Sequence, residues 1–339
     1  MHIVITGGAG FLGVRLARAL LEKNSLSLAG APAEAITTLS LVDRAEPPAD
    51  LLADPRVKAV VGDLNALLAA SPARVVPADA QLVVHLAAAV SGECEADFDL
   101  GMHSNLDATR ALLETCRALK TKPTVVFASS LAVFGHSEEQ PLPSTIEDNT
   151  LPTPLTSYGI QKFIGEQLTA DFGRKGFIRG RSARLMTVSV RPGKPNGAAS
   201  SFFSGMIREP LAGVRGACPV GPETPVALSS PGLTVRGLIR AAEATDAEWG
   251  PRTAVNLPAL STTVGEMAAA LERVAGKSVA ALIDWTPEAN IRKIVATWPG
   301  RIDAQRARGL GLLPEADFDG VIRDYIRENP HAVATAPQT

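Results

Sequence analysis

Several features that mark particular protein classes are scarce in this sequence of 339 residues. Its three cysteines (Cys94, Cys116 and Cys218) are odd in number and form no CxxC pair, which argues against a disulfide framework and against a zinc or other metal site. The formal charge of −2 and the absence of a long basic run give no reason to expect a nucleic-acid partner.

Long hydrophobic runs are also missing. No stretch approaches the roughly 18 uncharged apolar residues of a membrane span, so we expect no membrane partner. Glycines interrupt the apolar N-terminal run too early for a signal peptide. The default expectation is therefore a cytoplasmic protein whose cysteines are buried and idle.

What the sequence does contain favours a folded α/β protein. It is 46% hydrophobic and 20% charged, which suits a protein with a generous core. Short apolar, β-branched runs alternate with segments of helical spacing, and this pattern predicts a Rossmann-type, doubly wound parallel sheet. The expected strands cover 2–6, 37–43, 57–62, 82–87 and 124–128, the expected helices cover 11–23 and 105–118, and residues 24–35 are expected to form a surface loop.

A glycine pattern directly after the first expected strand predicts a dinucleotide site. In Gly7-x-x-Gly10-x-x-Gly13, the first glycine permits a tight turn, the second a close approach to a pyrophosphate, and the third close packing of helix on sheet. The following helix begins at Phe11 and Leu12 and directs free N–H groups and its positive dipole end at the phosphates.

The carboxyl ends of the next strands supply the other expected cofactor contacts. Asp43 suits the adenosine ribose hydroxyls and repels a 2′-phosphate, which favours NAD, whereas Arg44 keeps NADP open. Asp63, followed by Leu64, ends the third strand where the adenine amino group is expected. After the fourth strand, small residues let the middle of the cofactor pass close to the backbone; this segment is Leu86, Ala87 and Ala88.

Three polar side chains predict a site for hydride transfer. Tyr158, one of only two tyrosines, lies four residues before Lys162, so both side chains share one helix face. The ammonium is expected to lower the phenol pKa from its usual value of about 10, and Ser130 closes the fifth strand, where it can bind a substrate oxygen. The alternative reading of Tyr158 and Lys162 is an ordinary surface pair.

The sequence resembles the extended short-chain dehydrogenase/reductases, a group that includes sugar-nucleotide epimerases and dehydratases. The resemblance implies that Ser130, Tyr158 and Lys162 form the catalytic triad, that Tyr158 and Lys162 also contact the cofactor, and that the cofactor is NAD. Two departures are Phe134, where many members have tyrosine, and the 30-residue gap between Gly13 and Asp43. The matching segments are TGGAGFLG (6–13), GDL (62–64), HLAA (85–88), Asn105, SSLAVFG (129–135), YGIQK (158–162) and RPG (191–193).

A narrower resemblance concerns the substrate. Residues 90–101, 191–213 and 298–303 are similar to the subgroup that oxidises a small sugar acid, D-erythronate, at C2 with NAD and releases NADH. The segment KPNG (194–197) departs from the Asn-x-(Tyr/Phe)-Gly-Pro pattern of sugar-nucleotide enzymes.

The side chains of that region suggest how an acid would be bound. A cation at Lys194 and donors at Ser91, Asn196 and Ser200 suit a carboxylate, beside Ser130 and Tyr158 at the reacting hydroxyl. Arg184 is a second candidate for the carboxylate, and a solvated face explains it equally well.

The expected division of labour places the NAD-binding Rossmann domain in residues 1–190. From about residue 191 the alternation weakens, and residues 191–330 are expected to be mainly a substrate-binding region, with room for some elements to return to the first domain. A helix is expected at 263–275, with Thr263 as its cap and Glu266 completing a capping box.

Two alternative functions stay open at this stage. One is a sugar-nucleotide epimerase or dehydratase that uses the same triad, and the other is a non-catalytic NAD-binding protein. The family resemblance also permits a homodimer, paired through the 105–118 helix and the Tyr158 helix, without requiring one.

Overall fold

The computed structural model describes residues 1–193 and 198–334. Within these residues, seven strands form one sheet in which every neighbouring pair is parallel, in the order β12-β8-β7-β6-β1-β4-β5. The order reverses beside β1, which confirms the predicted doubly wound fold. The strands are β1 (His2–Thr6), β4 (Thr38–Asp43), β5 (Val57–Val61), β6 (Ala80–His85), β7 (Thr124–Ser130), β8 (Arg179–Leu185) and β12 (Val255–Asn256).

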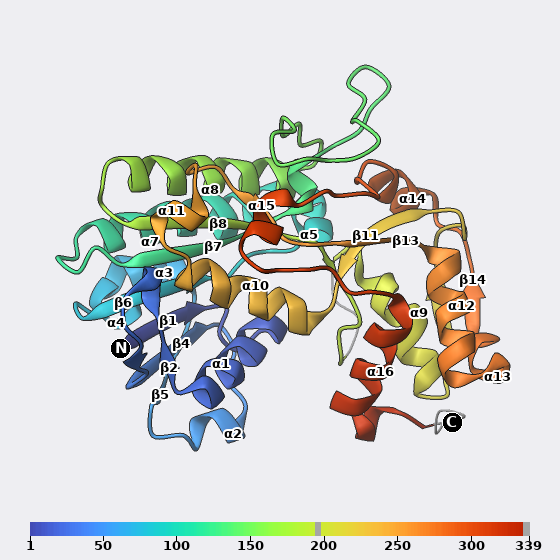
Figure 1. Ribbon diagram of the computed structural model, residues 1–339, viewed down its shortest axis with the longest axis horizontal. Helices are drawn as coiled ribbons and strands as arrows, with labels where there is room; N and C mark the ends of the chain where they lie inside the picture. Colours follow the sequence, from blue (N-terminus) through green and yellow to red (C-terminus); the bar gives the residue numbers. More distant parts are fainter. Residues whose placement is uncertain (194–197, 335–339) are drawn as a thin grey trace.

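Helices cover both faces of the sheet (Figure 1). Successive strand side chains point to opposite faces, so Ile3 and Ile5 pack in one core and Val4 in the other. The first core also contains residues of α1 (Phe11–Lys23) and α10 (Pro231–Glu243). The second contains residues of α3 (Leu64–Ala70) and α7 (Ala108–Arg117), with α8 (Ser157–Arg174) packed against it.

A smaller lobe lies to the right in Figure 1. Its core is formed by apolar faces of α9 (Ser201–Leu211), α12 (Val264–Ala275) and α16 (Phe318–Glu328). A mixed sheet joins this lobe to the larger one; it consists of β9 (Thr187–Val188), β11 (Pro225–Ser229) and β13 (Leu260–Thr263).

Some segments after residue 190 return to the larger lobe. Strand β12 pairs with β8, and Val235, Leu238 and Trp249 are buried in the same core as α1. Residues 302–312 also contribute side chains to that core. The larger lobe is therefore built from several separate stretches of chain.

The structure corrects two local expectations and refines a third. Residues 24–35 are not a plain surface loop, because β2 (Ser25–Leu26) pairs with β3 (Glu34–Ala35) and Leu26 is buried in the core. Thr263 caps α12 as predicted, but Glu266 pairs with Arg273 instead of returning to the cap.

The expected 105–118 helix begins earlier than predicted. A π-helical turn over Met102–Asp107 leads into α7 and places the Asn105 side chain toward the interior. There it hydrogen-bonds both backbone groups of Ala89 and the Gln161 side chain. These buried contacts lie at a π-helical turn, a local irregularity that often marks functional sites in helices.

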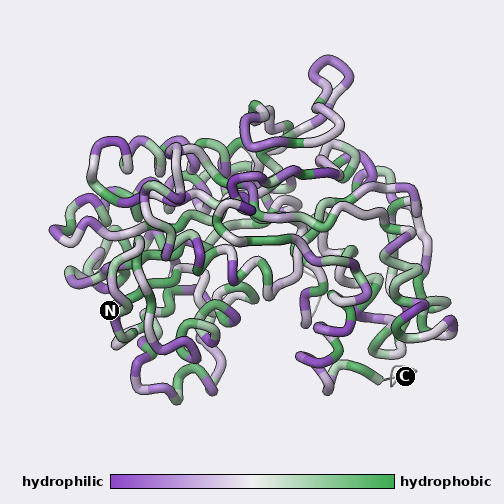
Figure 2. The backbone as a smooth tube through the Cα atoms, in the orientation of Figure 1, coloured by the Kyte–Doolittle hydropathy of each residue, from purple (hydrophilic) through white to green (hydrophobic). Residues whose placement is uncertain are grey.

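The connection between β7 and α8, residues 131–156, projects from the top of the molecule and is hydrophilic at its tip (Figures 1 and 2). The strands of the central sheet, by contrast, are predominantly hydrophobic in Figure 2, as expected for strands covered on both faces. No helix in the described ranges combines the length and the apolar character that crossing a membrane requires.

Candidate active site

A cavity of about 550 Å³ opens at the carboxyl ends of β1, β4, β6 and β7. This edge is where doubly wound sheets bind their ligands. Lys194 and Asn196 lie outside the described residues. Apart from Arg184, all the other predicted site residues line the cavity: Gly7, Gly10, Phe11, Leu12, Gly13, Asp43, Asp63, Leu64, Leu86, Ala87, Ala88, Ser91, Ser130, Tyr158, Lys162 and Ser200.

The backbone of the glycine turn lies so close to neighbouring backbone atoms that side chains are excluded at Gly7 and Gly13. Gly7 has a φ of +72°, and a Cβ there would lie 2.8 Å from the Ala87 nitrogen. A Cβ on Gly13 would lie 2.1 Å from the Gly7 oxygen. The turn is therefore packed closely against the segment that follows β6 and against the first turn of α1, and it lines the cavity where a pyrophosphate would bind.

Asp43 and Arg44 differ in what they do at the end of β4. The Asp43 carboxylate accepts hydrogen bonds from the backbone nitrogens of Ala9 (3.0 Å) and Ala45 (3.2 Å), so it lines the cavity in a fixed position. The Arg44 guanidinium instead donates to Asp63 at 2.7 Å. Because that cation already has a carboxylate partner, it is a poor receptor for a 2′-phosphate, and the geometry favours NAD over NADP.

His85, at the end of β6, is an uncharged structural residue. Its Nδ1 hydrogen-bonds Thr6 at 2.6 Å and its Nε2 hydrogen-bonds Thr109 at 3.0 Å. Burial, assisted by the Lys162 charge, lowers the pKa of His85 to about 3. The ring thus joins β1, β6 and α7 directly below the cavity without carrying charge at neutral pH.

Helix α8 brings the predicted acid/base pair together. Thr156 caps its first turn by accepting a hydrogen bond from the Gly159 nitrogen. The Lys162 ammonium is buried, donates to the Ala128 carbonyl at 2.9 Å, and lies 5.6 Å from the centroid of the Tyr158 ring. Ser130, at the end of β7, faces the same cavity, so the spacing read from the sequence yields the expected constellation.

The electrostatics of this pair differ from the sequence expectation. Burial raises the pKa of Tyr158 to about 12, against smaller lowering effects of Ser130 and Arg191. Burial likewise lowers the pKa of Lys162 to about 8. In the protein alone the phenol pKa is therefore raised and not lowered as predicted, because loss of hydration outweighs the nearby charges.

Arg191 is the cation that the sequence analysis missed. Its side chain lines the cavity, where Nη2 donates to Ser200 at 2.9 Å and Nε to the Val188 carbonyl at 2.9 Å. Loss of hydration lowers the pKa of Arg191, against a smaller raising effect of Tyr158, which lines the same cavity. The signal in the sequence is the arginine of the RPG segment (191–193), which the family resemblance includes as a matching motif and not as a ligand.

Arg184, by contrast, is neither a carboxylate ligand nor part of a solvated face. It is 5% exposed and forms two hydrogen bonds of 2.8 Å with the carboxylate of Glu166, which is 2% exposed. Glu166 also accepts a hydrogen bond from Ser129. This buried ion pair joins β7, β8 and α8 immediately behind Ser130 and Lys162.

Sequence comparison identifies the wider group to which these features correspond. Residues 3–249 match the NAD dependent epimerase/dehydratase family. The chain belongs to this family. A D-erythronate dehydrogenase from Cupriavidus necator is 51% identical over 97% of this chain and 98% of its own length. One from Haemophilus influenzae is 40% identical over 96% of this chain and 99% of its own.

A solved structure agrees with the fold. The nucleoside-diphosphate-sugar epimerase from Agrobacterium tumefaciens is 40% identical and covers 98% of this chain and 95% of its own, with a TM-score of 0.89. Its similarity extends over both lobes, so the smaller lobe is shared as well as the sheet.

The cofactor of this epimerase/dehydratase family member is NAD. The glycine turn fits its pyrophosphate, because side chains are sterically excluded at Gly7 and Gly13. Asp43, Ala87 and Ala88 line the same cavity, where the carboxylate would hold the ribose hydroxyls and the two alanines would leave room for the cofactor near the backbone. Among the described residues, no three His, Cys, Asp or Glu side chains gather as a metal site would require.

Proposed function

We propose that this chain oxidises D-erythronate at C2 to 2-dehydro-D-erythronate, with NAD as the oxidant and release of NADH. The two D-erythronate dehydrogenases that match nearly the whole chain support this assignment. The structural observation that carries it is the half-buried Arg191 guanidinium, which lines the same cavity as Tyr158 and donates to Ser200. A cation for a carboxylate beside a base for a hydroxyl is what a 2-hydroxy acid requires.

The side chains divide the reaction between them. Tyr158 removes the proton of the C2 hydroxyl, while Ser130 holds that oxygen through its hydroxyl group. NAD, when bound, would supply the acceptor for the hydride that leaves C2. The Lys162 ammonium stabilises the phenolate of Tyr158 and holds the nicotinamide ribose in place. Since burial alone keeps the phenol protonated, the reaction depends on positive charge assembled beside it.

Substrate recognition is assigned to the border of the two lobes. We place the carboxylate at Arg191 and Ser200, with Ser91 as a further donor. Ser91 accepts a hydrogen bond from the Ala199 nitrogen at 3.3 Å, so these groups already lie close together. Lys194 and Asn196 remain candidates on sequence grounds, from the segment just beyond Arg191.

The proposal also covers the cellular location and the oligomeric state of the enzyme. We assign it to the cytoplasm and to a homodimer paired through α7 and α8. Ile160 on α8 is 46% exposed, which leaves apolar surface for such a contact. Sedimentation of the purified protein at several concentrations would test the dimer, which predicts twice the mass of one chain.

A sugar-nucleotide epimerase is the alternative, and the Agrobacterium tumefaciens structure is the observation that favours it. The two functions differ in whether NADH accumulates. An epimerase returns its hydride to the substrate in each cycle, whereas a dehydrogenase releases NADH.

The deciding experiment follows the near-ultraviolet absorbance of NADH. The enzyme and NAD are mixed with D-erythronate, D-threonate, L-threonate or UDP-glucose. We expect NADH with D-erythronate alone. If no NADH forms with any of the three acids and UDP-glucose is converted without net NADH, the epimerase function would replace this proposal.

A further inference from the structure

A separate cavity of about 270 Å³ lies at the opposite edge of the sheet from the active site. It is bordered by Arg179 and Arg181 at the start of β8, whereas Leu185 at the end of the same strand borders the active site. Its other walls come from Lys122, before β7, from Thr169, Ala170 and Gly173 of α8, and from residues 250–252, after α11 (Asp246–Trp249). The NAD and substrate groups assigned above use none of these residues.

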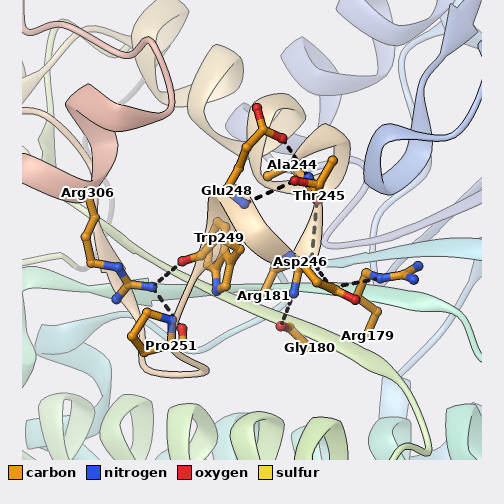
Figure 3. A network of polar contacts seen from close by, with 10 residues as sticks. All are labelled: Arg179, Gly180, Arg181, Ala244, Thr245, Asp246, Glu248, Trp249, Pro251 and Arg306. Carbon is orange, nitrogen blue, oxygen red and sulfur yellow. Dashed lines mark hydrogen bonds and ion pairs between the residues drawn. The ribbon is translucent and has the colours of Figure 1, made fainter.

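Positive charge dominates the lining. Lys122, Arg179, Arg181 and Arg252 face a single carboxylate, that of Asp246. Asp246 accepts hydrogen bonds from both Arg179 and Arg181 (Figure 3). Lys122 and Arg252 form no ion pair with any residue in the described part of the chain. The cavity therefore carries an excess of cations that the protein itself leaves unneutralised.

Arg181 is held firmly and is incompletely paired. It is 5% exposed, its guanidinium lies 5.2 Å from the Trp249 ring, and Nη2 also donates to the Ala244 carbonyl. Its Nε is buried and has no hydrogen-bond partner among the described residues. Since buried polar groups are usually satisfied, this guanidinium is unusual as a purely structural element.

The wall opposite β8 is also fixed by the fold. Arg306 donates from Nη2 to the carbonyls of Trp249 (2.8 Å) and Pro251 (2.9 Å), as Figure 3 shows. Thr245 and Glu248 form a reciprocal capping box at the start of α11. The loop that carries Arg252 is therefore anchored at its base, so the cavity is preformed.

We propose that this cavity binds the phosphate group of a small molecule, either inorganic phosphate or a phosphorylated metabolite. Guanidinium groups match phosphate oxygens in geometry, and the surplus of cations suits a dianion better than a monoanion. The volume fits a phosphate with a short organic body and is too small for a macromolecular segment. Bound phosphate joins β7, β8 and the 250–252 loop at the edge opposite the active site.

The test uses NAD-saturated protein, so that the pyrophosphate site is already filled. Binding of inorganic phosphate and of glycerol 2-phosphate is measured by calorimetry, and the melting temperature is followed with each, against sodium chloride of equal ionic strength. We expect both binding heat and a rise in melting temperature of a few degrees. The stronger of the two probes identifies whether the site takes free phosphate or an ester.

Matched variants locate the site. Lys122→Ala/Arg252→Ala removes the two unpaired cations and should weaken phosphate binding at least about tenfold, because charge-assisted contacts are lost. Arg215→Ala/Lys277→Ala removes an identical pair of exposed charges from the smaller lobe and should leave affinity unchanged. Without phosphate both variants should melt like the parent, since none of the four side chains is buried.

Three results would overturn the proposal. They are no response to either probe beyond that of chloride, unchanged affinity in Lys122→Ala/Arg252→Ala, and an equal loss in the control variant. The last would show a general charge effect rather than a site.

Discussion

Gly159 lies directly against the carbonyl oxygen of Ala132: a Cβ on Gly159 would come within 2.1 Å of that oxygen. The contact sets the distance between the first turn of α8, which carries Tyr158, and the segment that follows Ser130. A glycine inside a helix lowers its stability, so its presence here reflects the need for close approach.

Gly159→Ala should therefore damage catalysis more than it damages folding. The methyl group pushes Tyr158 away from Ser130, and a displacement of about 1 Å can reduce kcat about 100-fold. Gly173→Ala, in the last turn of the same helix, is the matched control, because its Cβ would meet Gly180 at an ordinary 3.5 Å. Steady-state kinetics of both variants check this; full activity in Gly159→Ala would show that the contact is dispensable.

Tyr158→Phe should remove turnover and retain the cofactor. The phenol oxygen is the proposed proton acceptor, and loss of a general base reduces rates by about 100- to 10,000-fold. The NAD dissociation constant, measured by calorimetry, should change little. Loss of NAD binding and turnover together would instead indicate a structural role for the tyrosine.

Lys162→Met should stabilise the protein without cofactor while inactivating it. Burial lowers the pKa of Lys162 to about 8, so the folded state holds this proton less tightly than the unfolded state does. At neutral pH the buried Lys162 charge lowers the unfolding free energy of the parent by its full amount. This loss of stability disappears as the pH rises from about 8 to about 10.5.

Urea unfolding of the parent and of Lys162→Met at pH values across this window measures the difference. The stability advantage of the variant should be largest at neutral pH and shrink on the alkaline side. A constant advantage at all pH values would mean that the ammonium is not the source.

The Glu166–Arg184 pair should behave as a unit. Glu166→Leu leaves the Arg184 guanidinium buried without its carboxylate, which should cost about 3–5 kcal/mol of unfolding free energy. The double change Glu166→Leu/Arg184→Met removes both charges and should recover most of that loss. Chemical denaturation of Glu166→Leu, Arg184→Met and the double variant gives the coupling energy between the two side chains. Losses of unfolding free energy that simply add would contradict this prediction.

Arg191→Met tests the proposed carboxylate contact. Removing a charge-assisted hydrogen bond should raise the KM for D-erythronate by about 100-fold and leave the KM for NAD unchanged. Erythritol, which lacks the carboxylate, should be an equally poor substrate for parent and variant. An unchanged KM for D-erythronate would mean that a group other than Arg191 binds the carboxylate.

The cofactor half of the site could be predicted because its signals are local. Gly7 and Gly13 exclude side chains through contacts within one strand–turn–helix unit, and Asp43 follows directly after a strand. Tyr158 and Lys162 needed only helical spacing to bring them together. Each of these relationships is encoded within a few residues of sequence.

The substrate half depended on contacts that no short window contains. Arg191 is held at the cavity by Ser200, at the start of α9, and by the Val188 carbonyl of β9, and Arg184 is neutralised by Glu166 on another element. Strand β12 has two residues, too few to show an alternating pattern. Burial reversed the expected direction of the Tyr158 pKa shift, and burial is a property of the whole fold.

The repeated passage of the chain between the two lobes has an evolutionary consequence. An exchange of the sequence beyond residue 190 with that of a relative would also replace β12 and α10, and with them part of the core around α1. A single crossover at this position therefore disrupts the core of the larger lobe. New substrate specificities on this scaffold should arise by single substitutions at positions such as Arg191 and Ser200, within an otherwise inherited chain.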